Sequence, residues 1–180
     1  LKSDDFLTTL MSTFTFSLMI VPGTIVVALF LAVLIHDNLK GMKIYKIIFS
    51  ATLGISVAAS AMIFRFFYHP ELGFFNELLS KVGIGKVGWL IDPNWALIAI
   101  ALPTIWISIG FNFIVLLGGI QNIPKELYES AQIDGAGWWH QFTKITLPQL
   151  SPILFFVTII LVINSFQSFA QIDLMTKGGP

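Results

Sequence analysis

The chain has 180 residues and a mass of 20.0 kDa, and 56% of its residues are hydrophobic while only 11% are charged. Soluble domains have about 45–50% apolar and about 25% charged residues, so this composition indicates a membrane protein. Ten Lys and Arg balance ten Asp and Glu, and this balance disfavours binding to nucleic acid. The chain has no cysteine, which excludes disulfides, thiolate metal sites and cysteine nucleophiles.

Four apolar stretches are free of Asp, Glu, Lys and Arg and have about the length that a bilayer requires. A hydrocarbon core of about 30 Å needs ~20 mostly apolar residues in a helix. The stretches are too long for core strands and lack the period-2 alternation of barrel strands. We therefore expect an all-α, polytopic membrane helix bundle in one domain over residues 1–180. The expected spans are approximately 10–35, 47–64, 95–120 and 152–172.

The connections between these spans predict the orientation of the bundle. The first connection, residues 36–46, is short and contains Lys40, Lys43 and Lys46. The positive-inside rule places such a basic turn in the cytoplasm. Alternation then puts residues 68–94 outside, residues 121–151 inside and both ends of the chain outside.

The long inner connection has the helix start and stop signals of a folded segment. Pro124 stands where a helix would begin, residues 125–132 are good helix formers, and Gly135 is typical of a helix C-terminus. We expect a short surface helix with Leu127 and Ala131 on one face. On these residues alone, an interfacial turn that merely connects two spans remains the alternative.

The order of residues in this connection resembles the EAA loop of ABC importer permeases. Glu129-Ser130-Ala131 is followed after three residues by Gly135, and after nine more by Ile145-Thr146-Leu147-Pro148. The flanking residues 123–128 and 134–136 are similar to the carbohydrate branch of that family, the permeases of the maltose and glycerol-3-phosphate type. Ser130 is a departure, because the family usually has Ala at this position.

The resemblance covers the whole chain and implies a permease subunit that moves a sugar or related polyol across the bacterial cytoplasmic (inner) membrane. The chain opens with Leu1 rather than Met, and the family pattern implies one further span on each side, so we expect a segment of a six-span protein. Residues 121–151 would form the cytoplasmic EAA loop, whose coupling helix docks on an ABC ATPase. The resemblance places the following residues at that contact: Glu126, Leu127, Glu129, Ser130, Ala131, Asp134, Gly135, Leu147 and Pro148.

Cofactors are not expected in this chain. No Gly-rich run has the spacing of a P-loop with its Lys and Ser or Thr. The resemblance implies that ATP and Mg²⁺ are used by separate cytoplasmic ATPase subunits, so this chain is not expected to be an enzyme. It also implies a second permease subunit, identical or different, and a periplasmic or lipid-anchored solute-binding protein. His36, His69 and His140 lie far apart in the sequence, so we expect no metal site.

A substrate path requires polar side chains that do not face lipid. Ser108 and Asn112 form one such pair, at i and i+4 in the third expected span. In the last expected span, polar residues at i, i+3, i+4 and i+7 would share one helical face: Asn164, Gln167, Ser168 and Gln171. This set suits a neutral polyol better than an ion. The same amides could instead bind neighbouring helices of the bundle.

Two other classes of function remain open. A helical membrane scaffold protein would recruit a soluble partner through the inner loop and would need no polar path. A secondary transporter normally has Asp, Glu, His or Arg within its spans, and the four expected spans have none. We therefore favour the importer permease as the working hypothesis.

Overall fold

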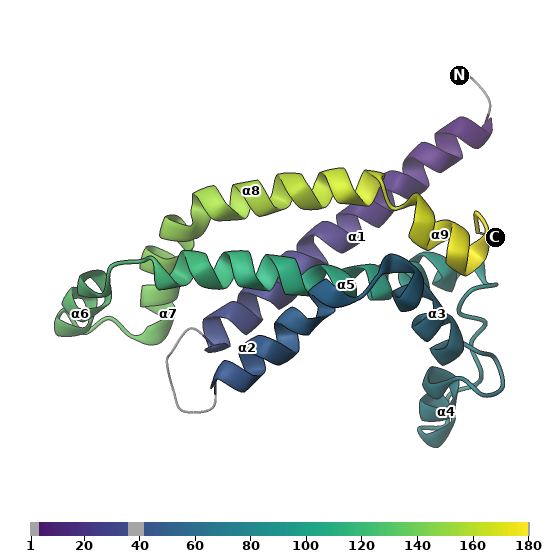
Figure 1. The fold of residues 1–180 in the computed structure, drawn as a ribbon, viewed down its shortest axis with the longest axis horizontal. Helices are drawn as coiled ribbons and strands as arrows, with labels where there is room; N and C mark the ends of the chain where they lie inside the picture. The colour runs from purple at the N-terminus through teal and green to yellow at the C-terminus, as the bar shows by residue number, and fades with distance from the viewer. Residues whose placement is uncertain (1–3, 36–41, 180) are drawn as a thin grey trace.

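The computed structural model describes residues 4–35 and 42–179, which form helices joined by short connections and contain no strand. Three long helices run along the molecule: α1 (Asp4–Ile35), α5 (Pro93–Gln121) and α8 (Leu147–Phe166) (Figure 1). Among residues named from the sequence, Leu1, His36 and Lys40 lie outside the described ranges. For the part that is described, the all-α prediction is confirmed.

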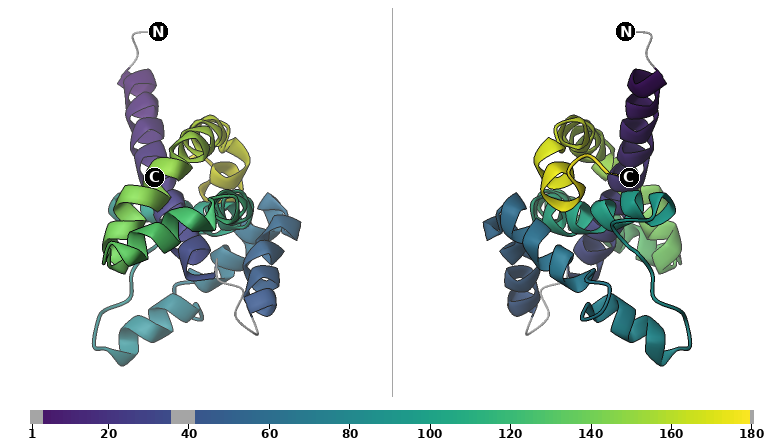
Figure 2. Two further views of the ribbon diagram at one scale, coloured as in Figure 1. Left: turned by 90° about the vertical axis from the view of Figure 1, so that its left-hand side faces the viewer. Right: turned by 90° about the vertical axis from the view of Figure 1, so that its right-hand side faces the viewer.

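Helix α5 is the centre of the bundle. It contacts α1, α8, α9 and the elements of the second expected span, and in end-on views α8 and that second span lie on different sides of it (Figure 2). The Asp92 side chain accepts a hydrogen bond from the Asn94 N–H at 2.9 Å, and Pro93 stands in the first turn. Both features favour a helix start at this point.

The apolar core is divided between the two ends of the bundle. One cluster joins α1, α5 and α8 near the inner loop, and its fully buried members include Phe113, Leu116 and Leu150. The other cluster lies towards α9 and includes Phe16, Ile20 and Tyr68. Side chains of α8 pack directly on Gly119 of α5, where an added Cβ would lie 2.5 Å from Ile153 Cδ1.

The second expected span, 47–64, is broken. Helix α2 (Met42–Ser50) and the 3-10 helix η1 (Ala51–Gly54) lead to α3 (Val57–Phe67), and the two arms are bent by 101°. Ser56 lies between them in an extended conformation, and its hydroxyl accepts a hydrogen bond from the Ala59 N–H, so α3 begins as a new helix. The described residues thus contain three helices that can cross a membrane, or four if the bent pair is one span.

The last expected span, 152–172, has different limits. The helix begins with α7 (Trp138–Gln141), passes through the π-helix η2 (Phe142–Thr146) and ends with α8 at Phe166. After a break, α9 (Phe169–Thr176) continues in another direction (Figure 1). The Ser168 hydroxyl donates to the Asn164 carbonyl at 2.8 Å. In an unbroken helix that carbonyl would accept the Ser168 N–H, so this side chain competes with the helical hydrogen bond.

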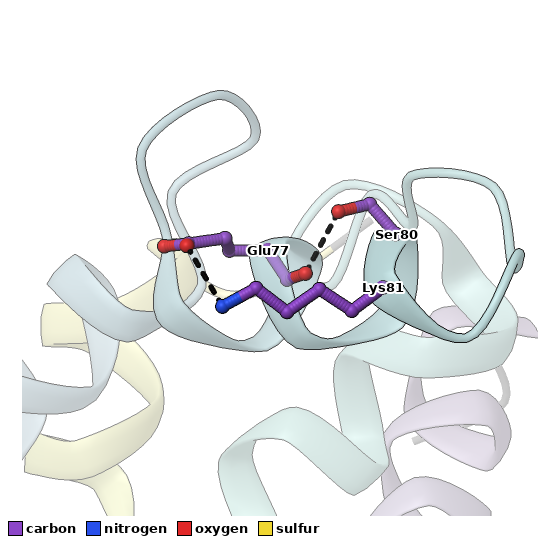
Figure 3. A network of polar contacts seen from close by, with 3 residues as sticks. All are labelled: Glu77, Ser80 and Lys81. Carbon is purple, nitrogen blue, oxygen red and sulfur yellow. Dashed lines mark hydrogen bonds and ion pairs between the residues drawn. The ribbon is translucent and has the colours of Figure 1, made fainter.

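Two short helices mark opposite ends of the molecule, α4 (Phe74–Lys81) at one end and α6 (Lys125–Ile133) at the other (Figure 1). On α4, the Lys81 Nζ lies 3.2 Å from Glu77 Oε1, and the Ser80 hydroxyl donates to the Glu77 carbonyl at 2.7 Å (Figure 3). An exposed pair at i and i+4 stabilises a helix by about 0.3–0.5 kcal/mol. The carboxylate of Glu77 compensates the positive charge of Lys81 at that end of the bundle.

Candidate functional site

Helix α6 is the short surface helix expected in the inner loop. It begins after Pro124, and Asp134 is its C-cap. Gly135 follows with φ at +78°, and the Ala136 N–H donates to the Ala131 carbonyl at 2.8 Å. Glycine adopts this left-handed conformation without the steric cost that a side chain brings. The helix end predicted from Gly135 is confirmed.

None of the residues of α6 is buried. Polar contacts hold the helix in place. Tyr128 Oη and Thr146 Oγ1 lie 2.9 Å apart and share a hydrogen bond. The Gln141 side-chain amide donates to the Ala136 carbonyl at 2.8 Å and so fixes the linker between α6 and α7. The first half of the loop is thereby attached to the long helix that begins at Trp138.

The residues expected at the partner contact on α6 are accessible to solvent to different degrees. Glu126, Glu129 and Ser130 are exposed, Leu127 is 37% exposed and Ala131 is half-buried. Leu127 and Ala131 share a face because they are one turn apart in the same helix. The helix therefore presents an apolar side chain flanked by two carboxylates.

The far end of the sequence motif lies close to α6. Leu147 and Pro148 form the first turn of α8, directly after Thr146, whose hydroxyl contacts Tyr128 of α6. Pro148 has no N–H to donate, and the wider π-helix η2 precedes it. The fold thus brings together two segments of the motif that are separate in the sequence.

An open cavity of about 950 Å³ lies beside α6. Its lining comes from the ends of α1, α2 and α5, from α6 and from the start of the last long helix, and it includes Lys46, Lys125 and Glu129. Lys46 of the first basic connection therefore lies at the same end of the molecule as the inner loop. Within the described ranges, no group of three or more His, Asp or Glu side chains could hold a metal ion.

The expected polar pair of the third span lies in the middle of α5. The Asn112 side-chain amide donates to the Ser108 carbonyl at 2.7 Å, so the two residues are one turn apart as predicted. Asn112 is buried, and its Oδ1 has no hydrogen-bond partner among the described residues. An unpaired buried carbonyl of this kind costs free energy, and this cost calls for an explanation.

The second polar set does not share a helical face, so this prediction is wrong. Asn164 lies in α8, Gln167 and Ser168 form the break, and Gln171 lies in α9. Asn164 and Gln167 are exposed, whereas Gln171 is 3% exposed and its amide contacts Met175 Sδ at 3.7 Å. The spacing rule holds only for an unbroken helix.

A polar contact between helices escaped the sequence analysis. The Ser165 hydroxyl of α8 donates to the Ser17 hydroxyl of α1 at 2.8 Å, and both side chains are buried. The residues are 148 positions apart, so no local pattern could have paired them. Small polar residues that bond across helices are common in membrane bundles.

A comparison with known proteins shows to which family this chain belongs. Residues 2–180 match the family described as binding-protein-dependent transport system inner membrane component. The chain belongs to this family. It is therefore a multi-pass protein of an inner-membrane transport family, and the resemblance found in its inner loop is confirmed.

Named relatives carry sugars and related solutes. The trehalose/maltose transport system permease protein of Thermococcus litoralis is 34% identical over 93% of this chain and 57% of its own length. The sulfoquinovosyl glycerol transport system permease protein of Agrobacterium fabrum is 34% identical over 94% of this chain and 55% of its own length. The chain thus spans little more than half of the length of these relatives.

A solved structure has the same fold. The crystal structure of a bacterial alginate ABC transporter in complex with an alginate pentasaccharide-bound periplasmic protein matches with a TM-score of 0.85 and 30% sequence identity. The match covers 98% of this chain and 62% of that chain. The overall fold of this chain is therefore one that is known in an ABC transporter.

Proposed function

We propose that the protein containing this chain is the permease subunit of an ABC importer that carries a sugar or related polyol across the inner membrane. The observation that carries the proposal is α6, a surface helix on which Glu126, Leu127 and Glu129 are all exposed. Membership of the transport family and the sugar-transporting relatives support it.

In this proposal α6 docks on a separate cytoplasmic ATPase, which binds ATP and Mg²⁺, while this chain holds no cofactor. Glu126 and Glu129 accept hydrogen bonds from basic side chains of the ATPase, and Leu127 and Ala131 pack in its groove. The remaining members of the contact are Ser130, Asp134, Gly135, Leu147 and Pro148.

Movement of the ATPase reaches the bundle through the contacts of α6. Tyr128 holds Thr146, and Thr146 begins the helix that packs along α5 and α1. A displacement of α6 therefore moves α8 as a body, which is the two-state element that coupling requires. The break at Gln167 and Ser168 separates α8 from α9 and allows the two helices to respond differently.

The proposed substrate path passes the polar groups at mid-bundle. Asn112 offers an unpaired acceptor, with Ser108 one turn away. Asn164, Gln167, Ser168 and Gln171 cluster around the break between α8 and α9, where backbone and side chains can contact a solute. Amide groups of this kind recognise the hydroxyls of a sugar.

The proposal also specifies the partners of the chain and its orientation in the membrane. The inner loop with α6 faces the cytoplasm, and α4 and α9 lie towards the periplasm. A second permease subunit covers apolar surface such as Phe155 and Phe156 of α8, which are exposed in the isolated chain. A periplasmic or lipid-anchored solute-binding protein delivers the substrate.

Uptake by proteoliposomes tests the proposal. Full-length permease is assembled with its ATPase and second permease, and radiolabelled sugar is supplied outside with the binding protein. We expect uptake that requires ATP inside the vesicles. Binding of the ATPase without uptake of any sugar or polyol would favour the scaffold, and uptake driven by an ion gradient would favour a secondary transporter.

A further inference from the structure

A second cavity, of about 360 Å³, lies at the opposite end of the bundle from α6. Its walls come from the end of α3, from the turn before α5 and from the end of α9. The residues that define its chemistry are Arg65, Tyr68, His69, Trp89 and Lys177. None of these residues belongs to the coupling loop or to the proposed path.

The charged side chains in this cavity are of one sign. Arg65 and Lys177 line it, and no Asp or Glu is among its lining residues. Lys81, at the same end of the molecule, is already paired with Glu77 (Figure 3). Within residues 4–35 and 42–179, neither Arg65 nor Lys177 has such an acidic partner. The charged side chains that line the cavity are therefore both cations, which favours an anionic group over a cationic one. Three carboxylates lie near the cavity in sequence but do not line it: those of Glu71, Asp92 and Asp173.

His69 adds a directed hydrogen-bond donor. Its Nδ1 accepts from the backbone N–H groups of Glu71 and Leu72 at 3.3 Å and 3.2 Å. An imidazole nitrogen that accepts carries no proton, so in the neutral ring the proton is on Nε2. These two contacts leave the Nε2–H unused, and His69 is among the residues that line the cavity.

Tyr68 supplies an observation of a different kind. Its side chain is 2% exposed, and its hydroxyl is buried with no hydrogen-bond partner among the described residues. Burial raises the pKa of Tyr68, so the hydroxyl remains protonated and able to donate. A buried tyrosine hydroxyl without a partner costs free energy, and such a group calls for a ligand or water.

Hydrogen bonds of Asn76 hold one wall of the cavity together. Asn76, which is 3% exposed, donates to the carbonyls of Pro70 and Val87 and accepts from the indole Nε1–H of Trp89. The Trp89 ring lies 5.6 Å from the Tyr68 ring, centroid to centroid. An aromatic wall with a few convergent donors is the usual composition of a small-molecule site.

We propose that this outer cavity binds the anionic group, a carboxylate or a phosphate, of a sugar or polyol. Arg65 and Lys177 hold the charge, Tyr68 and His69 donate hydrogen bonds, and the Trp89 ring packs against the apolar part of the solute. That the solute is a sugar or polyol rests on the proposed function. Such a site would make acidic or phosphorylated sugars the preferred substrate class.

Equilibrium dialysis tests this site on the full-length permease assembled with its partner subunits, in phosphatidylcholine nanodiscs without ATP. The radiolabelled probes are glucuronate and glycerol 3-phosphate, with glucose and glycerol as their neutral counterparts. We expect saturable binding of at least one anion, about tenfold or more tighter than its neutral counterpart. Equal binding of each pair, or no binding of either anion, would overturn the proposal.

Two variants assign the binding to the cavity. Arg65→Gln combined with Lys177→Gln should weaken anion binding about tenfold or more. Lys86→Gln removes an exposed lysine of the same outer region that does not line the cavity, and it should have no effect. Tyr68→Phe should weaken anion binding about threefold to tenfold. Anion binding that is unchanged in the double variant would contradict the assignment.

A lipid phosphate has the same chemistry as the proposed solute, so a second measurement separates the two. In a polyoxyethylene detergent free of phospholipid, the solute site still binds its anion, and phosphatidylglycerol does not displace it. Displacement by phosphatidylglycerol would assign the cavity to lipid headgroups and overturn the solute site. ATP-driven uptake of a neutral sugar in either case would leave the proposed importer function intact.

Discussion

The indole Nε1–H of Trp89 donates to Asn76 Oδ1 at 3.0 Å, across 13 residues of the outer connection. The same oxygen accepts the Val87 N–H at 3.1 Å, and the Asn76 amide donates to the carbonyls of Pro70 and Val87. Every hydrogen-bonding direction of this buried side chain is used. Asn76 therefore holds the two sides of the outer connection together.

Replacing Asn76 should destabilise the outer connection. Asn76→Leu keeps the branching at Cγ but leaves the buried partner groups unpaired, so we expect a loss of about 2–4 kcal/mol in unfolding free energy. Thermal unfolding of the full-length permease and limited proteolysis between residues 70 and 90 measure it. Asn94→Leu is the control, because Asn94 is exposed. Equal loss in both variants would contradict the role of Asn76.

The hydrogen bond between Tyr128 and Thr146 should couple α6 to α8. In a double-mutant cycle of Tyr128→Phe and Thr146→Val, we expect a coupling energy of about 0.5–1.5 kcal/mol. Hydrogen exchange of the α6 amides reports the local stability, and each single variant should speed exchange. Strictly additive effects would show that the two hydroxyls do not interact.

Backbone conformation at Gly135 offers a matched pair of variants. Gly135 has φ at +78° and Gly137 has φ at −69°, and neither has an atom within 4 Å of an added Cβ. Gly135→Ala should therefore destabilise the end of α6 by about 1–2 kcal/mol, through backbone strain alone. Gly137→Ala should be neutral. Circular dichroism and hydrogen exchange distinguish the two, and similar behaviour would contradict the left-handed turn.

Close packing of α5 on α8 can be tested at neighbouring glycines. A Cβ on Gly119 would lie 2.5 Å from Ile153 Cδ1 and 2.7 Å from Leu150 Cδ2, whereas Gly118 has nothing within 4 Å. Gly119→Val should lower stability by about 1–3 kcal/mol, since it overpacks the interface. Gly118→Val should change it little. Thermal unfolding compares them, and a reversed order would show that Gly119 does not face α8.

The parts of the fold that the sequence predicted depend on local patterns. Runs of apolar residues without charges marked α1 and α5, whose ends at Ile35 and Gln121 lie close to those expected. The short helix before Gly135 was also predicted, since proline and glycine mark helix ends through their own backbone preferences. The family motif added the reading of α6 as a coupling helix, which stays a proposal.

The features that were missed depend on competition between hydrogen bonds or on distant partners. At the break, the Gln167 N–H and the Ser168 hydroxyl both donate to the Asn164 carbonyl, and hydropathy carries no sign of this arrangement. The bend before α3 depends on the extended conformation of Ser56, and a serine within an apolar run does not by itself predict a helix start. The contact of Ser17 with Ser165 requires the tertiary fold.

The most direct test of the account is a charge reversal on α6. Glu129→Arg is made in the full-length permease, and co-purification of the ATPase and ATP hydrolysis stimulated by the binding protein are measured in liposomes. Glu71→Arg is the control, because Glu71 is also exposed but belongs to the outer connection. We predict that Glu129→Arg lowers both readouts at least about tenfold while Glu71→Arg leaves ATPase association unchanged. Unchanged association and hydrolysis in a folded Glu129→Arg variant would contradict the account.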